Sequence, residues 1–136
     1  MTTDRPAAGL LDTSVFIANE SGRQLDTSLI PEQVATTVVT LAELNAGVLA
    51  ARTSAIRARR LRTLDAVADM TALPVDEEAA QLWALLRVHL AEVGRRVRVN
   101  ELWIAAIAAA KHLPVVTQDG DFDALEGVAG LVIVRV

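Results

Sequence analysis

The longest uninterrupted apolar run in the sequence covers residues 102–110, inside the segment ELWIAAIAAAKH at 101–112. A helix with this composition is apolar on almost every side, and such a helix is stable only in the interior of a domain. The run is far shorter than the roughly 20 residues that a membrane-spanning helix needs. The segment therefore predicts a helix buried against a sheet, with Lys111 and His112 at its C-terminal end.

Short apolar runs rich in β-branched residues predict the strands of that sheet. They lie at 34–40 (VATTVVT), 114–117 (PVVT) and 131–136 (LVIVRV), with 9–12 (GLLD) as a weaker candidate. Runs that are apolar at consecutive positions are typical of parallel strands covered on both faces. We therefore expect a parallel sheet with helices on both sides.

Helical patterns separate these runs. Two sets of apolar residues recur at helical spacing: Ala58, Leu61, Leu64 and Ala68, and then Leu82, Leu86, Leu90 and Val93. Strands that alternate with helices predict an α/β fold, a three-layer domain whose central parallel sheet of four to five strands is flanked by helices. No repeat, low-complexity tract or linker divides the sequence, so we expect one domain over residues 1–136.

The sequence contains no cysteine, which excludes disulfides, thiol nucleophiles and thiolate zinc sites and suits a reducing compartment. Residues 1–9 (MTTDRPAAG) lack the basic start and apolar core of a secretion signal. We therefore expect a cytoplasmic protein with no membrane partner.

Four acidic residues lie where a predicted strand ends or the next helix begins. They are Asp12 in LLDTS, Glu43 in VVTLAEL, Glu101 in VRVNELWIAA and Asp119 in VVTQDGDF. Ligands of open α/β sheets bind at the carboxyl ends of the strands, so we expect these carboxylates to converge. Clustered carboxylates raise one another's pKa unless a cation lies among them. Oxygen ligands favour Mg²⁺ or Mn²⁺, and such a site can promote phosphodiester hydrolysis.

Each of these acids also has a purely structural explanation. Asp12 and Glu101 could cap or begin a helix. Thr40 followed by Glu43 is a capping-box pattern, and the DGD sequence at Asp119 suits a turn. Their common position at strand ends, in four separate segments, favours a site over four unrelated local roles.

Four further polar residues are candidates for supporting roles. Ser14 and Thr117 could hydrogen-bond the carboxylates or the substrate, or else the local backbone. Asn100 could assist the glutamate that follows it. Asp121 could face the site in place of Asp119, although we favour Asp119 as the ligand.

The formal net charge of −4 is unusual for a nucleic-acid-binding domain, but it equals the charge of the four candidate acids alone. The rest of the chain is therefore neutral overall. Arg95, Arg96 and Arg98 precede the buried helix and are candidates for binding RNA phosphates. A denser group of arginines at positions 52, 57, 59, 60 and 62 is more simply explained as a solvated helix face.

In motif order, and along nearly its whole length, the sequence resembles the PIN-domain nucleases of the VapC type. LLDTSVFIA resembles the family's first strand with its leading acid, and VVTLAEL resembles its second strand and helical glutamate. VNELWIAAIAAAKHLPVVTQDGDF resembles the long C-terminal signature. The acidic residues that match are Asp12, Glu43, Glu101 and Asp119.

This resemblance implies a PIN-like fold, a Mg²⁺ or Mn²⁺ site and endonucleolytic cleavage of structured RNA such as tRNA or rRNA. It also implies a homodimer that is silenced by a VapB-type antitoxin, whose C-terminal segment lies across the toxin and can place a basic side chain in the acidic site. As a separate hypothesis about roles, we expect Asp12 and Glu101 to hold the principal ion, while Glu43 and Asp119 complete its shell and orient the attacking water.

One position departs from the family pattern, because Glu101 follows Asn100 where the family usually has aspartate. One extra methylene can move a metal ligand by about 1 Å, and a misplacement of that size can cost on the order of 100-fold in rate. Two hypotheses follow. The chain is an active endoribonuclease toxin, or it is a catalytically weakened PIN-like module that binds antitoxin or RNA without cutting.

Two other α/β families place acids at strand ends, and both fit the sequence less well. A haloacid-dehalogenase-like phosphatase needs paired aspartates after its first strand, where this chain has only LDTS. A response-regulator receiver needs adjacent acids early in the chain and an aspartate on a middle strand, and neither is evident here.

Overall fold

The computed structural model describes residues 5–136, and its centre is a five-stranded sheet with the strand order β3-β2-β1-β4-β5. The strands are β1 (Ala8–Leu11), β2 (Gln33–Thr37), β3 (Ala72–Leu73), β4 (Val115–Thr117) and β5 (Ile133–Arg135). Every neighbouring pair is parallel. From the central β1 the chain proceeds to β2 and β3 on one side, and later to β4 and β5 on the other. The predicted parallel sheet of four to five strands is confirmed.

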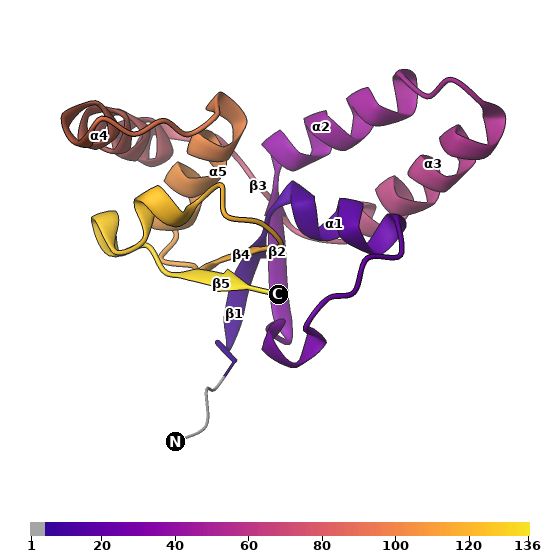
Figure 1. Cartoon of the computed structure of the whole chain (residues 1–136), viewed down its shortest axis with the longest axis horizontal. Coiled ribbons are helices and arrows are strands. Elements are labelled where there is room, and N and C mark those ends of the chain that lie inside the picture. The colour runs from indigo at the N-terminus through magenta and orange to yellow at the C-terminus, as the bar shows by residue number, and fades with distance from the viewer. Residues whose placement is uncertain (1–4) are drawn as a thin grey trace.

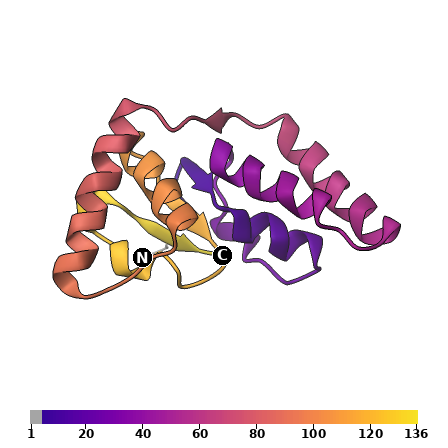
Figure 2. The same ribbon diagram turned by 90° about the horizontal axis from the view of Figure 1, so that it is seen from above.

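Helices cover both faces of this sheet, as Figures 1 and 2 show. The helices α1 (Thr13–Glu20), α2 (Val38–Leu49) and α3 (Ser54–Ala68) lie on one side, and α4 (Glu77–Val93) and α5 (Val99–Ala110) lie on the other. Three short 3₁₀ turns occupy Thr27–Leu29, Asp123–Leu125 and Val128–Gly130. The predicted three-layer α/β fold is confirmed. No helix within residues 5–136 has the length and apolar character needed to cross a membrane.

The two faces of the sheet contribute to two separate apolar clusters. Leu10 and Val115 pack with α4 and α5, whereas Leu11 and Val116 pack with the helices α1, α2 and α3. None of these four residues is more than 5% exposed. Because successive side chains of a strand point to opposite faces, a strand covered on both sides must be apolar at consecutive positions.

Helix α5 is buried as its composition predicts. No residue from Ile104 to Ala110 is more than 6% exposed, and most of this stretch is alanine, whose small side chain lets neighbouring elements approach closely. Trp103 of α5 stacks on Trp83 of α4 with a distance of 5.1 Å between ring centroids. Lys111 follows as the C-terminal cap, and His112 continues the chain with a positive φ of 56°.

Side chains of two neighbouring segments crowd the Cα atom of Gly9 in β1. A Cβ atom at Gly9 would lie 2.8 Å from Cγ2 of Val116 and 2.9 Å from Cγ of Pro31. Both distances are shorter than real Cβ atoms tolerate, so glycine is the residue that allows β1 to lie between β4 and the segment preceding β2.

The structure corrects the predicted strand at 34–40, because β2 ends at Thr37 and α2 begins at Val38. The Thr37 side chain accepts a hydrogen bond from the backbone N–H of Thr40 at 3.1 Å, which makes Thr37 the N-terminal cap of α2. The alternative explanation of Glu43 as the partner of Thr40 in a capping box is therefore wrong. The short edge strand β3 was not predicted, because its two residues show no periodicity.

Two adjacent leucines of α4 provide a matched test of this packing. Leu86 is 0% exposed and Leu85 is 50% exposed. We expect Leu86→Ala to lower the free energy of unfolding by about 2 to 5 kcal/mol, because it leaves a cavity between α4 and α5. Leu85→Ala should lower it by about 0.5 kcal/mol or less. Urea denaturation of both variants measures the difference, and equal losses would contradict the placement of α4.

Candidate active site

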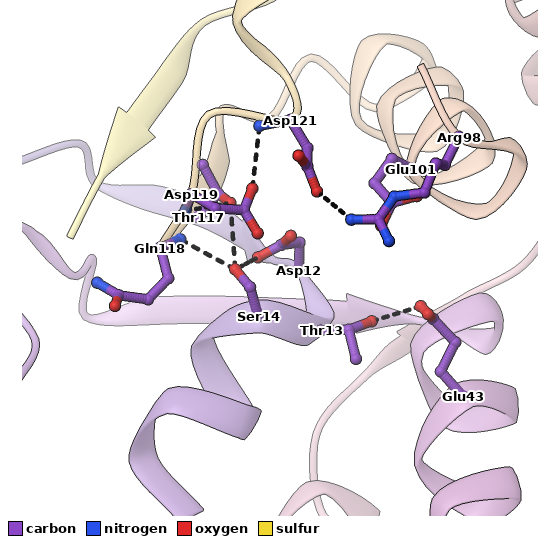
Figure 3. A network of polar contacts seen from close by, with 10 residues as sticks. All are labelled: Asp12, Thr13, Ser14, Glu43, Arg98, Glu101, Thr117, Gln118, Asp119 and Asp121. Carbon is purple, nitrogen blue, oxygen red and sulfur yellow. Dashed lines mark hydrogen bonds and ion pairs between the residues drawn. The ribbon is translucent and has the colours of Figure 1, made fainter. Parts of the chain in front are cut away.

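The carboxyl ends of β1, β2 and β4 meet at one edge of the sheet, and the four predicted acids lie around this edge (Figure 3). Asp12 directly follows β1, and Asp119 lies just beyond β4. Glu43 belongs to α2, which follows β2, and Glu101 lies in the first turn of α5. The order of the strands reverses between β1 and β4, which is where open α/β sheets bind ligands.

Asp12 is the most deeply buried acid of this group, with 3% of its surface exposed. It occupies the N-cap position of α1, but its side chain makes no capping hydrogen bond, so capping does not explain it. The pKa of Asp12 is raised to about 7, mainly by burial and also by the charge of the nearby Asp119, while hydrogen bonds from Ser14 and Thr117 oppose the shift. No cation of residues 5–136 pairs with this carboxyl group.

Ser14 connects the ends of β1 and β4. Its hydroxyl donates a hydrogen bond to Oδ1 of Asp12 at 2.7 Å and accepts one from the backbone N–H of Gln118 at 3.0 Å. It also lies 3.2 Å from the hydroxyl of Thr117, which accepts a bond from the backbone N–H of Asp119 at 3.4 Å. The two predicted supporting hydroxyls therefore hold both a carboxylate and the local backbone.

Thr13 holds Glu43 in a similar way. Its hydroxyl donates to Oε1 of Glu43 at 2.7 Å and lies 3.0 Å from the hydroxyl of Thr40. Thr13 was not among the predicted site residues, so this contact was missed. Its position next to Asp12 was the available clue, but only the packing of α1 against α2 shows which side chain it reaches.

Both aspartates of the DGD sequence belong to the site. The backbone N–H of Asp121 donates to Oδ1 of Asp119 at 3.0 Å, and Nη2 of Arg98 donates to Oδ2 of Asp121 at 2.6 Å. Nε of Arg98 lies 3.8 Å from Oε2 of Glu101. Burial is the main cause that raises the pKa of Glu101, and the charges of Glu43 and Asp121 add to it while Arg98 opposes it.

Three of the predicted residues lie outside this network. Asn100 is exposed in the first turn of α5, and Arg95 and Arg96 are exposed in the segment that precedes α5. Their side chains make no hydrogen bond or ion pair with any residue from 5 to 136. The structure therefore gathers Asp12, Glu43 and the acids near Arg98, but leaves these three at its periphery.

The site offers only carboxylate and hydroxyl oxygens, which are the donors that Mg²⁺ and Mn²⁺ prefer. The buried and unpaired carboxyl group of Asp12 is a natural position for such a cation. In the present arrangement, hydrogen bonds hold the carboxylates of Glu43, Asp119 and Asp121. In this arrangement, no three Asp, Glu or His side chains among residues 5–136 form a group that could hold one ion.

Residues 9–128 match the family model of the PIN domain. The chain is 70% identical to ribonuclease VapC5 of Mycobacterium tuberculosis, over 96% of this chain and 97% of that protein. It is 39% identical to ribonuclease VapC4 of the same organism, over 91% of this chain and 95% of that one.

Solved structures show the same similarity. A chain of VapBC-5, a member of the VapBC family of toxin-antitoxin systems from Mycobacterium tuberculosis, matches with a TM-score of 0.91 and 67% identity. That match covers 96% of this chain and 100% of the other. FitAcB from Neisseria gonorrhoeae matches with a TM-score of 0.72 and 27% identity, over 93% and 96% of the two chains.

The raised pKa of Asp12 predicts a pH-dependent loss of stability in the metal-free protein. Below pH 3.8 the carboxyl group is protonated in both the folded and unfolded chains and has no effect. Between pH 3.8 and about 7 only the unfolded chain ionises, so the folded state loses stability, and above pH 7 the loss is complete.

Replacement of the Asp12 carboxyl group by the neutral amide of asparagine should remove this pH-dependent loss of stability. In EDTA at pH 8 we expect Asp12→Asn to increase the free energy of unfolding by about 1 to 4 kcal/mol, with a smaller increase at pH 5. Urea denaturation across this pH range is the measurement. The exposed Asp65→Asn of α3 is the control, and the same pH dependence in both variants would contradict the special environment of Asp12.

Proposed function

The chain belongs to the PIN-domain family and, within it, to the VapC ribonucleases, and on this basis we propose that it is an endoribonuclease toxin that hydrolyses a phosphodiester bond of structured RNA with the help of Mg²⁺ or Mn²⁺. The substrate class that we propose is tRNA or rRNA. The observation that carries the proposal is the buried carboxyl group of Asp12 at the reversal of the strand order, surrounded by acids from α2, α5 and the segment after β4.

We assign the principal ion to Asp12 and Glu101, with Glu43 and Asp119 completing its shell. The oxygen donors fit this assignment, and the unpaired Asp12 would gain most from a positive charge. Binding requires some of these carboxylates to exchange their present hydrogen bonds for the cation. A bound Mg²⁺ or Mn²⁺ would stabilise the charge that develops on the phosphate and lower the pKa of water.

The chain's own residues would then bind and orient the reactants. Ser14 holds Asp12 through Oδ1 and Thr13 holds Glu43 through Oε1, so each hydroxyl would limit the positions that its carboxylate can adopt around the ion. In this proposal, a free oxygen of Glu43 or Asp119 accepts a hydrogen bond from the attacking water and aims it at the phosphorus. The single domain over residues 1–136 would act in the cytoplasm, where its RNA substrates are found.

We further propose that the chain forms a homodimer and is silenced by a VapB-type antitoxin that places a basic side chain in the acidic site. Two observations support the antitoxin partner. The similar chain of VapBC-5 comes from a member of a toxin-antitoxin family. In addition, the acids already accept a guanidinium within this chain, at 2.6 Å between Arg98 and Asp121.

The proposed activity predicts metal-dependent cleavage that requires Asp12. Antitoxin-free protein should cut a total RNA pool into discrete products with Mg²⁺ or Mn²⁺ but not with EDTA. Asp12→Ala should lower the cleavage rate by roughly 100-fold or more, because the site loses its buried ligand. Asp65→Ala, on the exposed face of α3, should cleave like the wild type. Undiminished cleavage by Asp12→Ala would refute the assigned site.

Glu101 decides between the two hypotheses drawn from the sequence, and the naming of the 70% identical relative as a ribonuclease favours the active one. We expect Glu101→Gln to lower cleavage by about 100-fold, because it removes the ligand charge, and Glu101→Asp to change it by less than about 10-fold. Gel assays of both variants provide the test. If only Glu101→Asp cleaves RNA, the natural chain is the weakened module.

A further inference from the structure

A basic groove lies between the end of α4 and the start of α5. None of Asp12, Glu43, Glu101, Asp119 and Asp121, which together we call the acid site, lines this groove. Arg87, Arg95 and Arg96 line it, together with apolar residues that include Leu90, Val97 and Leu102. The cavity has a volume of about 560 Å³. We refer to it below as the arginine groove.

The backbone between the two helices forms this groove. Helix α4 ends at Val93 and is capped by Gly94, which adopts a left-handed conformation with φ of +67°. The next N–H, that of Arg95, donates to the carbonyl of Leu90 at 2.9 Å and turns the chain back over the last turn of α4. Arg95 and Arg96 are thereby placed near Arg87, which lies two turns earlier along the same face of α4.

No carboxylate lines the arginine groove. Within residues 5–136, the side chains of Arg87, Arg95 and Arg96 make no ion pair and no hydrogen bond. Glu92 is close in sequence, but it borders a different hollow on α4, together with Leu85 and Val88. Three unneutralised arginines around one cavity are notable in a chain whose net charge is −4, and they indicate an anionic ligand.

The arginine groove adjoins the acid site through α5. Arg98 ends the connecting segment and contacts both Asp121 and Glu101. Val99 and Leu102 line the groove, while Glu101 between them turns toward the acids. A strand of RNA whose scissile phosphate reached the acids could therefore place neighbouring phosphates in the groove.

On the basis of the RNA cleavage proposed above, we propose that the arginine groove binds the phosphate backbone of the RNA beside the cleaved bond and holds the strand at the acid site. The acids by themselves repel a polyanion, so the substrate needs positive charge close to them. Arg87, Arg95 and Arg96 provide this charge outside the acid cluster. The groove shares the first turns of α5 with Glu101, through Val99 and Leu102, and this continuity with the acids favours RNA over an acidic protein segment as the occupant.

Binding to a labelled RNA stem-loop tests this role separately from catalysis. The parent protein carries Asp12→Ala, so that the RNA stays intact, and fluorescence anisotropy is recorded at several salt concentrations. The combined Arg87→Gln, Arg95→Gln and Arg96→Gln variant should bind at least about 10-fold more weakly. Its salt dependence, the slope of log K against log salt, should fall by about 2 to 3, because each phosphate contact contributes about 0.7 to 0.9.

Two controls distinguish RNA binding in the arginine groove from a general effect of the protein's positive charge. Replacing the same three residues by lysine should preserve most of the affinity, because the charges remain. A second triple variant, Arg23→Gln, Arg52→Gln and Arg62→Gln, removes equal charge from exposed positions associated with α1, α2 and α3 and should bind like the parent. Thermal unfolding of each variant verifies that it is folded.

Normal RNA binding by the groove variant, or an equal loss in the second triple variant, would overturn the proposal and leave the proposed cleavage intact. Loss of VapB-type antitoxin binding with normal RNA binding would also overturn it, because the groove would then serve the protein partner. Failure of the parent to bind RNA, together with failure of the wild type to cleave it, would overturn the groove and the proposed function together.

Discussion

The parallel pairing of β1 with β4 is the contact on which the rest of the structure depends. The N–H of Leu10 donates to the carbonyl of Pro114 at 2.9 Å, and the N–H of Asp12 donates to that of Val116 at 3.1 Å. These bonds place the end of the first strand beside the end of the fourth, although about a hundred residues separate them in the chain. The helices on each side bury the two strands, and the acids after them must then share one edge.

The site combines a high density of carboxylates with little internal neutralisation. Thr13 and Ser14 stabilise two of the acids with hydroxyl groups, which fix orientation without adding charge. Arg98 is the one cation paired with the acids among residues 5–136, and it lies at the rim, where 76% of its side chain is exposed. This imbalance supports the proposal that a metal ion, or a basic side chain of an antitoxin, supplies the missing positive charge.

Much of this arrangement follows from the sequence, because burial on both faces makes strands visible as apolar runs and parallel strands bring their ends together. The local boundary at Thr37 does not follow, since Thr37 and Thr40 are both good caps and only the packed structure selects one. The pairing of Arg98 with Asp121 is equally hidden, because it joins two loops distant in sequence. Long side chains at element ends are positioned by tertiary contacts, which periodicity does not encode.

Gly9 shows how far the determinants of the site extend beyond the residues that carry chemistry. The missing side chain at this position is what lets β1 lie against Val116 of β4. A side chain there would require Val116, Pro31 or β1 itself to shift, and β1 leads directly into Asp12. Natural variation in this lineage should consequently be restricted at position 9 as strictly as at the carboxylates, and a survey of acidic residues alone would overlook that restriction.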